Sequence, residues 1–375
     1  MFDKIDPYLQ NLVNVCDSHE RELDCIVYTQ NINYLRRYFD SNSIGEIVYT
    51  YPFISALGVK VKNHNLFRLA RLNFVTYITA STKVNCLMYN SKKLMNIPEY
   101  NIVKNSFTCA IIDTGLEPNI DMSIPYNNVV HFKDFVNGRE SLYDDNGHGT
   151  FVASVLSSSG VCSCGKYSGV VDNQKLVILK ALSSEGETDA FTILNAFEWI
   201  YKNHKKYDIK VVCMSFGSTV LGENDPLILG AEALWDIGIT VVVAAGNSGP
   251  SKESIKSPGA SRKLITVGAL DTNNINIADF SSRGPILNNF KPDLVAPGVN
   301  IVAGCNYKLV GKEYSTMSGT SVSTPMIAGI VCLFLDKNPS MSPNAIKRYL
   351  TTHAVSITGD RNKEGYGYID YSTIK

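Results

Sequence analysis

Three polar side chains stand where apolar runs of the sequence end or begin, and their types could support nucleophilic chemistry. Asp113 follows the run FTCAII, His148 lies in DDNGHGT ahead of the run FVASVL, and Ser321 lies in SGTSVSTP ahead of another apolar run. Each has an ordinary structural explanation. An aspartate there often caps a turn, a histidine at a helix start often lies at the surface, and a serine there often caps the helix. Together, however, they supply a carboxylate, a base and a hydroxyl.

These three groups suit one kind of reaction. A serine hydroxyl becomes a good nucleophile when a neighbouring base takes its proton, and imidazole suits that task near neutral pH. A buried carboxylate then fixes the imidazole tautomer and stabilises the imidazolium. The sequence therefore predicts acyl transfer with Asp113, His148 and Ser321 as the catalytic residues.

A fourth polar residue, Asn247 in AAGNSGP, follows the apolar run ITVVV. An asparagine at that place could merely cap a turn. Its amide could also donate to an oxyanion, with the backbone N–H of Ser321 at a helix N-terminus as a second donor. We therefore expect Asn247 in an oxyanion hole.

The segments that must hold these groups have the pattern of an α/β domain. From residue 107 onward, short runs rich in Val and Ile alternate with segments of helical periodicity. Strands that are apolar on both faces and separated by helices indicate a mostly parallel, doubly wound sheet, and such sheets bind ligands beyond the carboxyl ends of their strands. The expected strands are 107–113, 175–182, 211–217, 238–247 and 263–270, and the expected helices are 188–207, 225–238, 321–338 and 342–354.

Composition excludes several classes of partner. Lys and Arg number 35, as do Asp and Glu, so the formal net charge of +0 argues against nucleic acid or an anionic membrane surface. No apolar run approaches the roughly 18 residues of a membrane span, and the N-terminus lacks a signal-peptide pattern, so we expect a cytoplasmic protein. Nine cysteines, several of them inside apolar runs, favour free thiols over a disulfide framework.

A smaller module precedes the α/β domain. Residues 24–81 show a β-α-β-β-α-β order, which predicts a split βαβ, ferredoxin-like α+β fold. The polar stretch that follows, with NSKK and Pro98, reads as a linker. We therefore expect an N-terminal module over 1–85, a linker over 86–106 and the α/β domain over 107–375.

Several segments resemble the signature blocks of the subtilase family of serine proteases, in the family's order, over residues 105–355. They are IIDTG, DDNGHGTFVAS, VVVAAGNSGP, FSSRGP, KPDLVAPG and STMSGTSVSTPMIAGI. Within that family the chain is most similar to bacterial intracellular alkaline subtilases of the AprX type. The order Asp, His, Ser along the chain is also that of subtilisin.

The resemblance implies a subtilisin-like fold and a role for each matching residue. Asp113 would orient His148, His148 would act as general acid and base, Ser321 would attack, and Asn247 would stabilise the oxyanion. Substrate-binding roles would fall to Ser215, Phe216 and Gly217, which pair with the substrate backbone, and to Ala244, Ala245 and Gly246, which line a pocket for a large apolar side chain.

The resemblance also implies a zymogen. The N-terminal module would be an inhibitory prodomain and therefore a partner of the enzyme, and 86–106 would hold the bond cut by self-processing. Other partners would be protein or peptide substrates. No cofactor is required, and calcium is possible because many subtilases carry it, although no D-x-[DN]-x-[DN]-G loop is present.

The sequence departs from the family pattern at two places. Phe151 stands where a second histidine is common, and Val322 and Ser323 stand where Met-Ala is usual; we expect altered packing there without loss of activity. An inert subtilase-like protein that binds peptides is the main alternative function. An esterase is a further alternative, but the G-x-S-x-G elbow is absent around Ser321.

Overall fold

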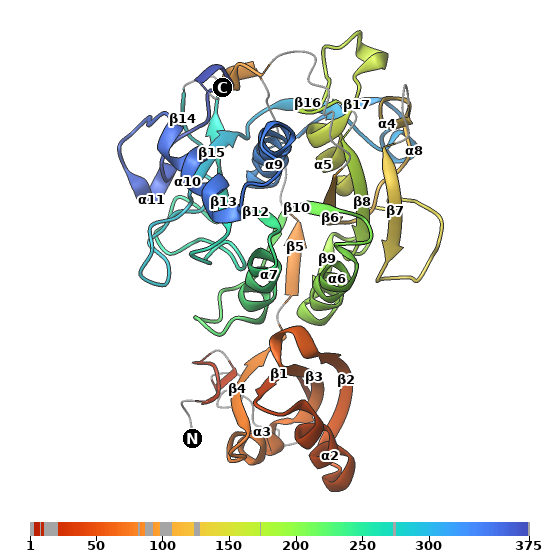
Figure 1. Ribbon diagram of the computed structural model, residues 1–375, viewed down its shortest axis with the longest axis vertical. Coiled ribbons are helices and arrows are strands. Elements are labelled where there is room, and N and C mark those ends of the chain that lie inside the picture. Colours follow the sequence, from red (N-terminus) through yellow and green to blue (C-terminus); the bar gives the residue numbers. More distant parts are fainter. Residues whose placement is uncertain are drawn as a thin grey trace.

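The computed structural model describes residues 4–7, 9–10, 22–81, 83–86, 93–97, 107–123, 128–172, 174–272 and 275–373. They form a small N-terminal module and a larger α/β domain, one above the other along the longest axis (Figure 1).

The N-terminal module is a four-stranded antiparallel sheet with two helices on one face. Its elements are β1 (Glu22–Thr29), α2 (Ile32–Asn42), β2 (Gly45–Tyr51), β3 (Ala56–Lys62), α3 (Asn63–Ala70) and β4 (Val75–Ala80). The strand order β2-β3-β1-β4 and the alternation of strands and helices confirm the predicted split βαβ topology.

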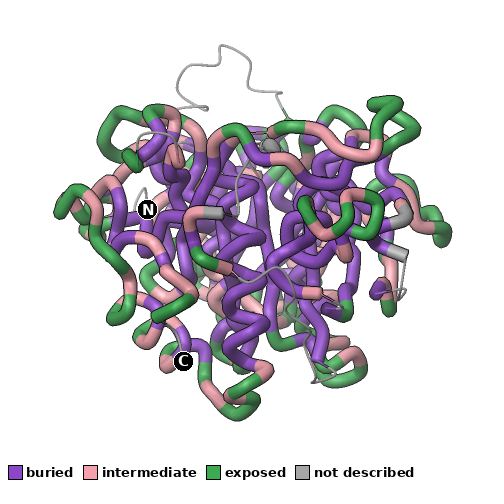
Figure 2. Tube along the Cα trace, turned by 90° about the horizontal axis from the view of Figure 1, so that it is seen from above, coloured by how far each residue is buried: buried purple, intermediate pink, exposed green. Residues whose placement is uncertain are grey.

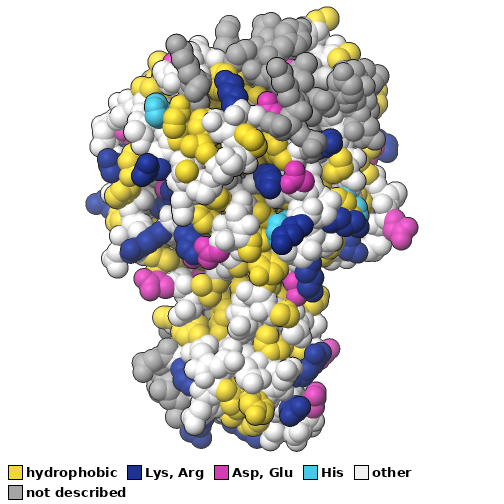
Figure 3. All heavy atoms as spheres, viewed as in Figure 1, with side chains coloured by type: hydrophobic (Ala, Val, Ile, Leu, Met, Phe, Trp, Pro, Cys, Tyr) yellow, Lys and Arg dark blue, Asp and Glu magenta, His cyan; other side chains and the backbone are white. Residues whose placement is uncertain are grey.

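Alternation along β1 gives this module two apolar faces. Cys25 and Val27 belong to the module's own core beneath α2 and α3, whereas Ile26 and Tyr28 belong to the core of the larger domain. The sheet therefore docks on the larger domain with the face that its helices leave uncovered. A space-filling view shows the narrowing between the two parts (Figure 3).

The larger domain is built on a sheet in the order β14-β13-β12-β10-β6-β8-β7, with β15 beside β13. Every pairing in it is parallel except that of β14, which confirms the predicted mostly parallel sheet. Its strands are β6 (Thr108–Asp113), β7 (Val129–Asp134), β8 (Lys175–Lys180), β10 (Ile209–Met214), β12 (Thr240–Ala244), β13 (Ile265–Asp271), β14 (Asn276–Ile277) and β15 (Leu294–Pro297).

Helices cover both faces of this sheet, as expected of a doubly wound fold. In Figure 1, α5 (His148–Ser157) and α9 (Thr320–Lys337) lie on one side, and α6 (Ala190–Asn203) and α7 (Pro226–Asp236) lie on the side of the N-terminal module. The buried residues concentrate in the interior, with exposed residues at the loops around it (Figure 2). The remaining elements of this domain include the helix α10 (Pro343–His353) and the short elements α4 (Ile120–Ser123), α8 (Tyr307–Val310), α11 (Arg361–Glu364), β16 (Ile301–Gly304) and β17 (Tyr314–Met317).

The helix α9 is long and apolar enough to cross a membrane, and it alone passes that test among the described residues. Of its 18-residue window, 89% is buried inside the protein, where it packs on β10, β12 and β13. It is the central helix of the core, which explains its composition.

A separate three-stranded sheet joins the two parts of the molecule. The strand β5 (Lys83–Cys86) lies between β11 (Phe216–Gly217) and β9 (Glu187–Asp189), antiparallel to both. The sequence predicts an irregular segment from residue 82 onward, so this strand corrects that expectation. Most of the predicted linker lies outside the described residues. The strand forms because both neighbours offer it backbone partners, which local sequence does not reveal.

Candidate active site

The site begins with a buried carboxylate and imidazole. Asp113 ends β6, His148 begins α5, and the two side chains are 0% and 1% exposed. The Nδ1 atom of His148 lies 2.6 Å from Oδ1 of Asp113. An Nδ1–H that donates to this carboxylate leaves Nε2 as the basic nitrogen of the ring.

A second carboxylate, that of Asp144, holds the turn that aims His148. Its Oδ1 accepts from the Gly147 N–H at 2.8 Å, and its Oδ2 accepts from the Thr150 N–H at 2.9 Å. Gly147 is the N-cap residue, with φ of 97°, a conformation that favours glycine. His148 is therefore the first residue of the helix and not its cap.

The D-T-G and H-G-T segments are in backbone contact. The Gly149 N–H donates to the Thr114 hydroxyl at 2.8 Å, and a Cβ on Gly149 would lie 2.1 Å from the Gly115 carbonyl oxygen. Only glycine at position 149 permits this approach. The glycine after the histidine therefore brings the imidazole within reach of Asp113.

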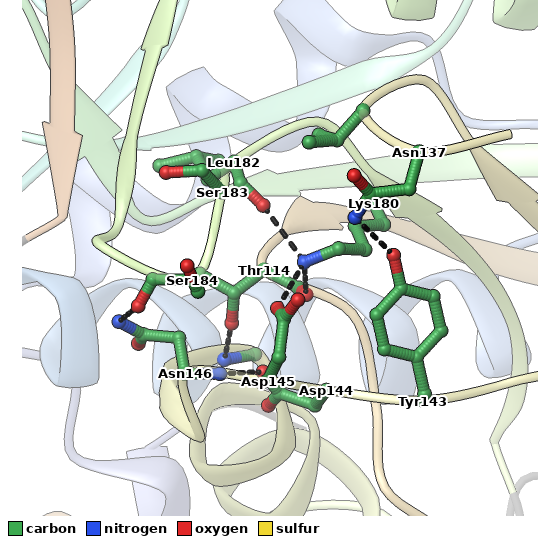
Figure 4. A network of polar contacts seen from close by, with 12 residues as sticks. Thr114, Asn137, Tyr143, Asp144, Asp145, Asn146, Lys180, Leu182, Ser183 and Ser184 are labelled. Atoms are coloured by element: carbon green, nitrogen blue, oxygen red, sulfur yellow. Dashed lines mark hydrogen bonds and ion pairs between the residues drawn. The ribbon is translucent and has the colours of Figure 1, made fainter. Parts of the chain in front are cut away.

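A buried lysine, which sequence reasoning missed, holds the segments that carry Asp113 and His148. Lys180, 0% exposed at the end of β8, donates from Nζ to the Thr114 carbonyl at 2.6 Å, to Asp145 Oδ1 at 2.6 Å and to the Leu182 carbonyl at 3.0 Å (Figure 4). Its three donors are thus satisfied, as a buried ammonium requires. A lone Lys in an apolar strand is the one signal that could have indicated it.

Ser321 lies in the first turn of α9, one residue after the helix begins. The N-cap residue is Gly319, with φ of 154°, so Ser321 is not a cap. Its Oγ is buried and makes no hydrogen bond to the described residues. The Ser215 hydroxyl donates to the Ser321 carbonyl at 2.7 Å and anchors this turn from behind. An uncommitted hydroxyl at a helix N-terminus suits a nucleophile better than a capping group.

Asn247 lies beside the same turn, held by a residue that the sequence did not single out. Its Oδ1 accepts from the Thr320 N–H at 3.0 Å and from the Thr320 hydroxyl at 3.1 Å. The Thr320 hydroxyl in turn accepts from the Gly246 N–H at 3.1 Å. With its oxygen so engaged, the amide of Asn247 keeps its N–H groups for another acceptor.

The predicted substrate-binding residues form two segments near this turn. Phe216 and Gly217 form β11 and pair with Cys86 and Asn85 of β5, whereas Ser215 is fully buried behind them. Ala244, Ala245 and Gly246 are buried at the end of β12. A Cβ on Gly217 or on Gly246 would meet the side chain of Lys256, at 2.6 Å and 2.5 Å respectively. Lys256 therefore lies across both segments, and no local pattern predicted it.

His148 and Ser321 both stand in the first turns of helices. α5 starts at His148 and α9 at Thr320, and the two helices pack on each other. Each N-terminus carries a partial positive charge that favours a developing anion. The arrangement can thus activate a hydroxyl and stabilise an oxyanion at one place.

Comparisons with known proteins identify the family of this chain. Residues 104–368 match the Subtilase family. The chain belongs to the subtilase family. Relatives of this subtilase include the serine protease AprX of Bacillus subtilis, 42% identical over 267 residues, and the alkaline protease of Alkalihalobacillus alcalophilus, 30% identical over 335 residues. These matches cover 65% and 87% of the chain. The chain spans 60% of the length of the AprX relative and 80% of that of the alkaline protease.

Solved structures share the fold of this subtilase. The epidermin leader peptide processing serine protease of Staphylococcus aureus superposes with a TM-score of 0.72 at 22% identity, over 93% of this chain and 97% of that one. The S41 psychrophilic protease gives 0.63 at 29% identity, over 72% and 93%. The likeness to the first of these concerns the fold alone.

The two departures from the family pattern have packing roles in this subtilase. Phe151 is 1% exposed within the main core, and Val322 is fully buried there. The Ser323 hydroxyl donates to the Ala296 carbonyl at 2.9 Å. The surroundings of these three residues are those of the packed interior.

The described residues contain no group of three or more His, Cys, Asp or Glu side chains that could hold a metal ion. The seven described cysteines carry free thiols. Calcium binding therefore stays an expectation drawn from the family.

Proposed function

We propose that this subtilase is a serine endopeptidase in which Ser321 is the nucleophile. The observation that carries the proposal is the buried pair of His148 Nδ1 and Asp113 Oδ1 at 2.6 Å, beside a helix turn that presents an unbonded serine hydroxyl. Family membership and the serine protease relatives support it.

The reaction follows from the roles of these groups. Nε2 of His148 takes the proton of the Ser321 hydroxyl as its oxygen attacks the substrate carbonyl carbon. The resulting oxyanion accepts from the Ser321 N–H and from the Asn247 amide. His148 then gives the proton to the leaving amine, the C–N bond breaks, and an acyl-enzyme remains. A water molecule, deprotonated by the same imidazole, hydrolyses the ester and restores the hydroxyl.

The substrate takes the place of β5 in this proposal. β9 and β11 present free edges once β5 leaves, and an extended peptide can pair with both, a known mode of peptide recognition. The small residues Ala244, Ala245 and Gly246 then border the pocket for the side chain at the cut bond.

We further propose that residues 1–85 are an inhibitory prodomain and that the chain processes itself. The antiparallel register of β5 supports this, because Asn85 is opposite Gly217 and Cys86 is opposite Phe216. Ser215, which directly precedes Phe216, donates its hydroxyl to the Ser321 carbonyl. The processed bond therefore falls within one or two residues after Cys86. The free thiols are consistent with action in the reducing cytoplasm.

Replacing the nucleophile tests both parts of the proposal. In a protease-free translation system the wild-type chain shortens by roughly 87 residues, as the strand register implies, whereas Ser321→Ala stays at full length. A fluorophosphonate probe labels the wild type and not the variant. Mass spectrometry and gel fluorescence measure the two effects.

The matched control is Ser323→Ala, which removes a hydroxyl from the same helix turn without touching the His148–Asp113 pair. It retains processing and labelling. If the wild type neither shortens nor reacts with the probe, the alternative of an inert peptide-binding regulator replaces this proposal. Shortening of Ser321→Ala alone in that system would exclude self-processing.

A further inference from the structure

A hollow lies at the opposite ends of the strands from the candidate active site. It has a volume of about 360 Å³ and lies between α10, the loop before β15, and Arg262, which precedes the first residue of β13 by three positions. The candidate active site is at the carboxyl ends of the strands, whereas this hollow is at their amino ends. Because β13 has seven residues, roughly 20 Å of strand separates the two.

One face of α10 forms a wall of the hollow. Asn344, Lys347, Arg348 and Thr351 all line it, and their spacing of i, i+3, i+4 and i+7 places them on a single helical face. The opposite face of α10 buries Ile346 and Leu350 in the core. The polar face is therefore held in a fixed orientation toward the hollow.

Positive charge dominates the lining. Arg262, Lys291, Lys347 and Arg348 are cationic, and Asp293 is the one acidic residue in the lining, a formal excess of three positive charges. Lys291 Nζ lies 2.6 Å from Asp293 Oδ2, and Lys347 Nζ lies 2.7 Å from its Oδ1. The single carboxylate is thus shared by the two lysines.

The two arginines have no acidic partner among the described residues. The one hydrogen bond of the Arg262 side chain there is a 3.5 Å contact from Nη2 to the Leu287 carbonyl, and the Arg348 side chain makes none. Both side chains lie in exposed residues. Two uncommitted guanidinium groups beside one hollow can receive an anion in the bidentate manner that arginine favours.

A neutral donor and an aromatic wall complete the lining. The Oδ1 atom of Asn344 accepts from Nε1 of Trp235 at 2.9 Å, which leaves the Asn344 amide nitrogen as a donor. Phe290 is 43% exposed and stacks edge to face with Tyr366, ring centroids 6.0 Å apart. The hollow therefore combines a held amide donor with an aromatic side.

We infer that this hollow is a binding site for a small polyvalent anion of the phosphate class, with Arg262 and Arg348 as its charged ligands and the Asn344 amide as a further donor. Its place in the fold links it to the active-site helix. β15 starts beside Asp293 and leads to Gly298, whose carbonyl accepts from the N–H of Gly319, the N-cap residue of α9, at 3.0 Å. The hollow is therefore connected through β15 to the segment that supports the Ser321 turn.

The test uses the full-length chain carrying Ser321→Ala, so that the sample does not digest itself. Inorganic phosphate and pyrophosphate are titrated to 20 mM against sodium chloride at constant ionic strength and pH 7.5, and the unfolding midpoint is recorded. A ligand that binds the folded state raises the midpoint along a saturable curve. The double variant Arg262→Gln and Arg348→Gln weakens the apparent affinity at least about tenfold, since two charge-assisted contacts are lost.

Lys202→Gln, which removes an exposed cation from α6, is the matched control and keeps the full response. Phosphate also stabilises proteins without binding, by exclusion from their surface, and that effect does not saturate. Equal responses of wild type and double variant, or a rise without saturation, would overturn the inference. Saturable binding of citrate tighter than that of both phosphates would overturn the phosphate class. Both arginines are exposed, and a midpoint without anion close to that of the parent chain verifies that the double variant folds.

Discussion

Thr320 shows how one hydroxyl can set the direction of another residue's donor. Its side chain donates to Asn247 Oδ1 and accepts from the Gly246 N–H, so it links the end of β12 to the start of α9. The Asn247 amide is held at two points, since the Thr320 N–H donates to the same oxygen. The orientation of the Asn247 amide thus depends on Thr320, a residue without a reactive role of its own.

Thr320→Val should therefore lower kcat while leaving KM nearly unchanged. One of two hydrogen bonds to Asn247 is lost, so we expect roughly a tenfold fall, smaller than the fall of about 10²–10³ expected for Asn247→Ala when an oxyanion donor is removed. Steady-state hydrolysis of a peptide substrate measures both constants. The matched control is Thr324→Val, one turn further along, whose hydroxyl is bonded to the Thr320 carbonyl. A rise in KM at constant kcat would instead assign Thr320 to substrate binding.

At the scale of single elements, α7 is capped at its N-terminus by a buried carboxyl group. Asp225 is its N-cap residue, 1% exposed, and its carboxylate accepts from Leu221, from two N–H groups of the first turn and from the Ser257 hydroxyl. Burial raises the pKa of Asp225 to about 6 in spite of these donors. The folded state therefore holds this proton more tightly than the unfolded state does.

The contribution of Asp225 to the free energy of unfolding should consequently fall as pH rises from 4 to 7. The raised pKa contributes stability that is complete below the unfolded pKa of 3.8 and is lost as pH rises through about 6, a change of about 3 kcal/mol for a shift of this size. Asp225→Asn, in chains that also carry Ser321→Ala, removes this pH-dependent part. Urea unfolding at a series of pH values measures it. Asp236→Asn, exposed at the end of the same helix, keeps the slope; an unchanged slope in Asp225→Asn would assign the effect to other groups.

Local sequence predicts some elements of this fold well and others poorly. α6 and α7 were predictable because their apolar residues recur at helical spacing and Asp189 and Asp225 cap them. β7 was missed because it is a half-exposed edge strand, and β5 because its partners are more than 100 residues away along the chain. The polar groups of the site were predictable from motifs. The roles of Thr320, Lys180 and Lys256 arise from tertiary contacts, which no local pattern records.

At the scale of the whole molecule, the sheet of the N-terminal module packs on the larger domain. Gly58 of β3 faces Phe191 of α6, and a Cβ on Gly58 would lie 3.0 Å from the Phe191 ring. Nearby, the Tyr51 hydroxyl donates to the Phe191 carbonyl at 3.1 Å. This contact is close enough to be disturbed by one substitution.

If the N-terminal module inhibits the processed enzyme, as proposed, Gly58→Val in the isolated module should weaken that inhibition at least about tenfold, because overpacking typically costs 1–3 kcal/mol. Inhibition constants from a peptidase assay give the comparison, and circular dichroism verifies that the variant module is folded. Arg37→Gln, exposed on α2 away from the contact, should inhibit as well as the wild-type module. If both variants inhibit equally, the module does not act through this face.

If a substrate takes the place of β5 between β9 and β11, as proposed, this small sheet sets a condition on what can be digested. Two neighbouring strand spacings leave a slot of about 10 Å, whereas a helix with its side chains needs about 10–12 Å and cannot offer backbone partners on both sides. A segment that enters must be extended over at least the four residues that β5 now contributes. Native proteins meet that condition only where their chain opens by local unfolding, so the rate at which a folded substrate is cut should follow the population of its open form. Under this proposal, the rate of cleavage at each segment of a folded substrate would depend on the local stability of that segment.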